Sequence, residues 1–146
     1  MKCIKNEMNL SFPSHSCNES YARSAVCAFV SSLDPTLEEL SDLRTAVSEA
    51  VTNAIVHGYR GTVGVVYISV KIYDDKDVRI CVRDRGIGIA DVAQAMQPFY
   101  SQGSDGEGER GGMGFTIMQS FTDRVHVHST LGKGTSVTMH KRFGSA

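Results

Sequence analysis

The segment DRGIG, residues 84–88, places an acidic side chain beside two glycines. Asp84 follows a β-branched segment, and Gly86 and Gly88 permit a backbone turn that approaches a ligand closely. A carboxylate there can accept a hydrogen bond from an exocyclic amine, such as the N6 amine of adenine. The segment is also typical of a turn that only closes a strand, so the motif by itself leaves both interpretations open.

The segment GGMGF, residues 111–115, places glycines directly before an expected helix. The free N–H groups and the dipole of a helix N-terminus form a phosphate site. A flexible hinge is an equal alternative for a glycine-rich segment. The chain has no GxxxxGK[ST] motif, so this is not a Walker loop.

A third polar feature lies in the apolar segment SEAVTNAIVHG, residues 48–58. Glu49 and Asn53 are four residues apart, so on a helix the carboxylate and the amide project from the same side. At 100° per residue they point away from the apolar stripe of this helix. An isolated pair of this kind more often belongs to a solvated helix face, and composition alone does not overturn that interpretation.

These residues must be positioned by the surrounding elements, and local patterns predict those elements. Thr36 and Glu39 form a capping-box pattern that opens a helix, expected to run to His57 and stop at Gly58. Its core-facing stripe is Leu40, Leu43, Val47, Val51 and Ala54. The other expected elements are a strand at 6–12, a helix at 19–33 capped by Asn18, strands at 65–74 and 77–84, a short helix at 91–97, a mobile glycine-rich loop at 103–114, a helix from 115, and strands at 124–130 and 134–142.

This order of elements predicts an α+β fold, a two-layer sandwich with helices and a mostly antiparallel sheet. The 146 residues are expected to form one domain, 1–146. The N-terminus, MKCIKNEMNL, lacks the apolar region of a signal peptide, and no apolar run is long enough to span a membrane, so we expect a cytoplasmic protein. The net charge of −1 argues against sequence-independent binding of nucleic acid.

The combination and order of the motifs are more specific than any one of them. Glu-x-x-x-Asn on a helix, Asp-x-Gly-x-Gly after a strand, a loop ending in Gly-x-Gly and a final Gly-x-Gly-Thr resemble the N, G1 and G2 boxes of the GHKL superfamily. Within it, the chain resembles the sporulation anti-sigma-F family of serine kinases from about residue 6 to 142. The segments that carry this resemblance are NESYAR (18–23), LDPT (33–36), SEAVTNAIVHGY (48–59), YISV (67–70), RDRGIGI (83–89) and GMGFTIMQSF (112–121).

The resemblance implies the Bergerat-type ATP-binding fold, with helices on one face of the sheet and ATP and Mg²⁺ as cofactors. It implies that Asn53 is the Mg²⁺ ligand and that Glu49 is the general base toward a serine hydroxyl. Asp84 would bind the adenine amine, with Thr135 nearby.

The same resemblance assigns the glycine-rich segment to the phosphates. Gly112 and Gly114 would leave N–H groups free for phosphate oxygens, and Arg110 would neutralise charge on the γ-phosphate as a lid closes. Residues 101–112 are expected to be mobile without nucleotide and to become ordered with ATP.

The resemblance also implies partners. Such proteins form homodimers, hold a sporulation sigma factor in the ATP-bound state, and phosphorylate an anti-anti-sigma factor on serine. Arg23 matches an arginine that contacts partners, although an ordinary solvated arginine is the alternative. Two other functions stay open: an ATP-binding anti-sigma module without kinase activity, and a general GHKL ATPase.

Overall fold

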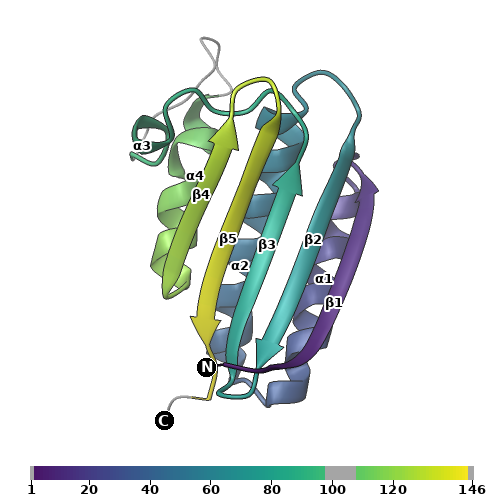
Figure 1. The fold of residues 1–146 in the computed structure, drawn as a ribbon, viewed down its shortest axis with the longest axis vertical. Helices are drawn as coiled ribbons and strands as arrows, with labels where there is room; N and C mark the ends of the chain where they lie inside the picture. Colours follow the sequence, from purple (N-terminus) through teal and green to yellow (C-terminus); the bar gives the residue numbers. More distant parts are fainter. Residues whose placement is uncertain (1, 98–107, 145–146) are drawn as a thin grey trace.

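The computed structural model describes residues 2–97 and 108–144, and for residues 108–113 it describes the backbone only. Its centre is one five-stranded sheet in the order β1-β2-β3-β5-β4, in which all neighbouring strands are antiparallel (Figure 1). The helices lie against one face of this sheet, as expected for a two-layer α+β sandwich. The strands are β1 (Ile4–Pro13), β2 (Val65–Tyr73), β3 (Asp77–Asp84), β4 (Arg124–Thr130) and β5 (Gly134–Arg142).

The helical layer has α2 at its centre, with α1 on one side and α4 on the other (Figure 1). The α-helices are α1 (Asn18–Val30), α2 (Leu37–Thr52), α3 (Val92–Ala95) and α4 (Gly108–Phe121). A 3-10 helix (Ser31–Leu33) follows α1, and a π-helix (Asn53–Gly58) follows α2. Within the described residues, no helix combines the length and apolar character that a membrane span requires.

The core forms because strands and helices each bury one apolar side. Along β2, the side chains of Val66, Ile68, Val70 and Ile72 are at most 1% exposed, which follows from the period of two along a strand. The predicted stripe of α2 packs on this face; Leu40 is partly buried, and the rest of the stripe is buried. Burying each of these side chains contributes on the order of 1.5–3 kcal/mol.

The capping box that begins α2 is confirmed. The Glu39 N–H donates to Oγ1 of Thr36 at 3.0 Å, and the Thr36 N–H donates to Oε1 of Glu39 at 2.9 Å. The prediction that Asn18 caps α1 is wrong, because Cys17 occupies the N-cap position and makes no side-chain cap bond. The Asn18 side chain instead donates from Nδ2 to the carbonyl of Pro13 at 2.9 Å. The Asn18 side chain therefore contacts the end of β1, five residues earlier, and caps no N–H group of α1.

The predicted helix to His57 has two parts in the structure. It is an α-helix to Thr52 and then widens into a π-helix, in which the Tyr59 N–H bonds to the carbonyl of Ala54, five residues earlier, at 3.1 Å. Periodicity in the sequence does not distinguish these two helix types. Single π turns occur often at functional sites, and this one begins at Asn53.

The loop predicted at 103–114 is wrong over residues 108–114, which belong to α4. Gly112 and Gly114 therefore lie inside the helix rather than before it. Glycine disfavours helices locally, but packing on a neighbouring helix overrides that preference. At Gly114, a Cβ would lie only 3.0 Å from Nδ2 of Asn53, so the glycine permits close approach of α4 to the start of the π-helix. The remainder of the predicted loop lies outside the described residues.

Candidate functional site

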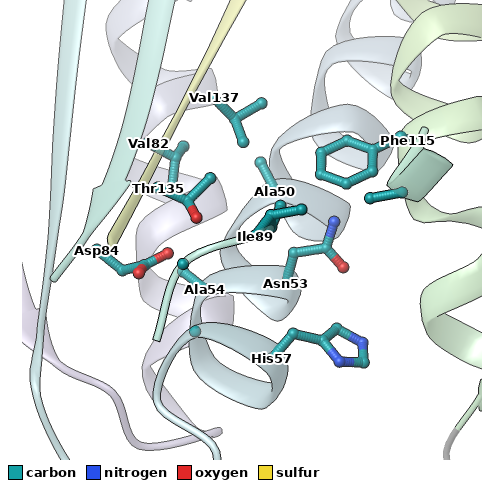
Figure 2. Close-up of a pocket in the computed structure, with 13 residues that line it drawn as sticks. Ala50, Asn53, Ala54, His57, Val82, Asp84, Ile89, Phe115, Thr135 and Val137 are labelled. Carbon is teal, nitrogen blue, oxygen red and sulfur yellow. The ribbon is translucent and has the colours of Figure 1, made fainter. Parts of the chain in front are cut away.

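A pocket opens between the π-helix, the ends of β3 and β5, and α4 (Figure 2). It brings together four residues that the sequence singled out: Asn53, Asp84, Gly88 and Thr135. Most of the remaining lining is apolar or small. The other lining residues are Ala50, Ala54, His57, Gly58, Val82, Ile89, Ala95, Phe115 and Val137.

Asp84 is one of the buried residues of the lining. It is the last residue of β3, pairs with Thr135 on β5, and is 6% exposed. Its Oδ1 accepts a hydrogen bond from the Gly86 N–H at 2.9 Å. Burial raises the pKa of the Asp84 carboxyl, and the N–H groups of Gly86 and Thr135 oppose that rise. The site therefore contains a hydrogen-bond acceptor in apolar surroundings.

The turn after Asp84 packs too tightly for side chains at two positions. A Cβ at Gly86 would overlap the backbone carbonyl of Gly58, and the Ile87 N–H donates to that same carbonyl at 2.9 Å. Gly88 has a φ of +76° and lines the pocket, and its backbone lies against Thr130. Both glycines predicted from the sequence thus let the backbone approach its neighbours, as small residues must do here.

Thr135 belongs to a short hydrogen-bond chain that the sequence did not predict. Its Oγ1 lies 2.8 Å from Oγ of Ser129, which donates to the Gly134 carbonyl at 3.0 Å and accepts from the Ile89 N–H at 2.7 Å. Since Ser129 uses its one proton on Gly134, Thr135 is the donor between the two hydroxyls. Ser129 thereby fixes the Ile89 wall of the pocket from β4, and no local motif marks it.

Asn53 and His57 lie on the opposite side of the pocket from Asp84 (Figure 2). His57 was missed in the sequence. The sequence spacing could have identified it, because His57 follows Asn53 by four residues, as Asn53 follows Glu49, and residues at this spacing share one helix face. Asn53 and His57 therefore add a second polar region to the lining, opposite Asp84 and Thr135.

Of the other predicted site residues, those whose side chains the structure describes lie outside the lining. Glu49 is half-buried on α2, one turn before Asn53. Arg110 and Gly112 lie in the first turns of α4, where the structure describes only the backbone. Arg23 lies on α1, an element that contributes nothing to the lining, and forms an ion pair with Glu19 at 3.6 Å. Arg23 is therefore separate from the pocket.

The lining fits a flat heterocycle with an amino group. Val82, Ile89 and Val137 supply apolar walls, the alanines of α2 and the π-helix leave space, and Asp84 supplies an acceptor for the amine. A cation would depend on the oxygen of Asn53, water and phosphate, since the described residues contain no group of three His, Cys, Asp or Glu side chains suited to a metal. The lining thus suits a heterocycle with an exocyclic amine, for which Asp84 is the available acceptor.

The sequence is similar to those of known proteins. Residues 13–141 match the family model described as the histidine kinase-like ATPase domain. The chain is 51% identical over 141 residues to the anti-sigma F factor of Priestia megaterium, covering 96% of this chain and 95% of the relative. It is also 51% identical over 140 residues to the anti-sigma F factor of Clostridium acetobutylicum, covering 96% of each chain.

A solved structure shows the same fold at low sequence identity. The structure of the RsbU and RsbW domains of Rv1364c from Mycobacterium tuberculosis has a TM-score of 0.68 and 16% identity. The match covers 95% of this chain and 33% of that one. The sheet and its helical layer therefore recur in a protein whose sequence has diverged widely.

Proposed function

The chain belongs to the anti-sigma F factor family of histidine kinase-like ATPase domains, and from that premise we propose that it is an ATP-dependent serine kinase that also holds a sporulation sigma factor. Its substrates are ATP and an anti-anti-sigma protein, which it phosphorylates on serine. The working form is a cytoplasmic homodimer that binds its sigma factor with ATP in place and makes no direct contact with nucleic acid or membrane.

One observation carries the proposal: a buried carboxylate, Asp84, faces across an apolar pocket toward Asn53 and His57 (Figure 2). Asp84 accepts a hydrogen bond from the adenine amine, and Thr135 lies beside Asp84. The phosphates then extend toward Asn53 and α4, where Arg110 contacts them. Gly112 and Gly114 lie inside α4, so their N–H groups bond within the helix and are not available to the phosphates.

A bound Mg²⁺ would be held by the side-chain oxygen of Asn53 together with phosphate and water oxygens, and it would neutralise phosphate charge. The protein's own contribution to transfer is orientation and proton removal. Glu49 takes the proton of the serine hydroxyl as the serine oxygen bonds to the γ-phosphorus and the bond to the β-γ bridging oxygen breaks, leaving ADP.

The test incubates the full chain with γ-labelled ATP and a candidate anti-anti-sigma protein. A kinase labels one serine of that protein, an ATP-binding anti-sigma module labels nothing, and a general ATPase releases phosphate without labelling it. Glu49→Gln conserves shape and removes the base, so it should bind ATP normally and lose about 10²–10⁴ in transfer rate. Near-normal transfer would remove Glu49 from the mechanism.

The partner surface is proposed to include Arg23, which is partly exposed on α1 and separate from the pocket. Arg23→Ala should weaken binding of the sigma factor while leaving ATP affinity unchanged. Equal sigma-factor binding by the variant and the wild-type chain, measured with ATP present, would show that Arg23 is an ordinary solvated arginine.

A further inference from the structure

The turn that carries Asp84 is held from outside its own strand. The last pair between β3 and β5 joins Asp84 to Thr135, so the next N–H groups find their partners elsewhere. The Arg85 N–H donates to the Tyr59 hydroxyl at 2.7 Å, and the Ile87 N–H donates to the Gly58 carbonyl at 2.9 Å. Two of the three N–H groups after Asp84 are thus bound by Gly58, the last residue of the π-helix, and by Tyr59, the residue after it.

The Gly86 N–H, between them, donates to Asp84 itself at 2.9 Å. The position of the Asp84 carboxylate is therefore tied to the position of the Gly86 peptide. That peptide is bracketed by the two contacts to Gly58 and Tyr59. A shift of the Arg85 peptide would shift the carboxylate as well.

The Tyr59 side chain is itself held in place, so its hydroxyl can fix the Arg85 peptide. Its side chain is 7% exposed, and its hydroxyl donates to the Val65 carbonyl at 2.6 Å while accepting from the Arg85 N–H. The hydroxyl thus has a fixed direction, with its proton on the Val65 side. A Cβ at Gly64 would overlap the Tyr59 ring, so the ring can occupy this position only because residue 64 is a glycine.

We propose that Tyr59 is a positioning residue for recognition of the nucleobase: its hydroxyl fixes the Arg85 peptide and thereby sets the Asp84 carboxylate to accept the exocyclic amine. This inference rests on the proposed function, in which Asp84 binds adenine. It adds a residue that touches neither the base nor the phosphates and acts only through the turn.

The experiment compares Tyr59→Phe with the matched control Tyr73→Phe in the full chain. Both tyrosines are 7% exposed, and both changes remove one hydroxyl. Tyr73, however, is the last residue of β2, at the other end of the strand from Val65, and its ring lies against the Arg79 guanidinium. Calorimetry measures the affinities for ATP and for purine riboside triphosphate, which lacks the amine. Thermal unfolding first shows that each variant folds.

Tyr59→Phe should weaken ATP binding by about 5-fold, since one neutral hydrogen bond no longer orders the acceptor, and should change binding of the amine-free analogue by less than about 2-fold. Tyr73→Phe should change neither affinity. Gly64→Ala keeps the hydroxyl but displaces the ring, so it should reproduce the selective loss of ATP affinity. It also carries the test alone if Tyr59→Phe does not fold.

Equal weakening of both nucleotides by Tyr59→Phe would show a general structural role and overturn the inference. The inference would also be overturned if both Tyr59→Phe and Gly64→Ala kept the wild-type preference for ATP over purine riboside triphosphate. The wild-type chain separates this inference from the proposed function. If the wild-type chain binds the two nucleotides equally, the assignment of Asp84 to adenine fails, and the inference fails with it.

Discussion

Replacing Asp84 with asparagine removes a buried charge while conserving the shape of the side chain. Burial is the main cause that raises the pKa of this carboxyl above its ordinary value of 3.8. A raised pKa in the folded state means that the folded chain holds the proton more tightly than the unfolded chain, so stability falls as pH rises from about 4 through the folded pKa. The free energy of unfolding of Asp84→Asn, relative to the wild-type chain, should therefore increase over that interval and stay constant above it.

The cost of the substitution should appear in nucleotide binding. A hydrogen bond to a charged acceptor contributes about 1.5–3 kcal/mol and a neutral one about 0.5–1.5 kcal/mol. The difference of about 1–1.5 kcal/mol corresponds to about 5- to 13-fold weaker binding of ATP. The asparagine amide can also donate to the O6 atom of guanine, so GTP affinity should not fall. The preference for ATP over GTP should decrease by about tenfold.

Calorimetry with ATP and GTP at pH 7 measures this preference, and urea unfolding between pH 3 and 7 measures the change in stability. Asp77→Asn is the matched control, because Asp77 begins the same strand and pairs with Lys2 at 2.6 Å, away from the pocket. An unchanged preference in Asp84→Asn would refute the adenine assignment. A stability difference that is flat with pH would refute the burial argument.

Three further changes test the metal site, the packing of the turn and the fold. Asn53→Ala should make ATP affinity insensitive to Mg²⁺, which titrations with and without a chelator detect; persistent Mg²⁺ dependence would exclude Asn53 as the ligand. Gly86→Ala places a Cβ against the Gly58 carbonyl and should lower the free energy of unfolding by about 1–3 kcal/mol, whereas an unchanged urea midpoint would show that the turn moves freely. Thr36→Ala loses the cap of α2 and should cost about 1 kcal/mol without affecting ATP affinity; reduced affinity would contradict a purely local role.

Local patterns in the sequence were sufficient for much of the fold. The strands at 77–84, 124–130 and 134–142 agree residue for residue with β3, β4 and β5, and the capping box at Thr36 begins α2. These features depend on alternation and on contacts within a few residues, so a linear sequence contains them. The motif at Asp84 was equally visible, because its glycines are adjacent to it in the chain.

Tertiary packing decided what those local features become. Periodicity directs Asn53 away from the apolar stripe. Only the packing of α4 against the start of the π-helix, with Gly114 next to Asn53, makes that side of the helix a wall of the pocket. The same packing accounts for Gly114 inside α4, against the local preference of glycine.

The environment of the Asp84 carboxyl also depends on residues far from it in the sequence. Its burial and its orientation depend on Gly58 and Tyr59, about 25 residues earlier, and on Thr135, about 50 residues later. Ser129 acts in the same way on Ile89 from another strand. Sequence spacing identifies residues that share a helix face or a turn, but a carboxyl's environment is the sum of groups that only the folded chain brings together.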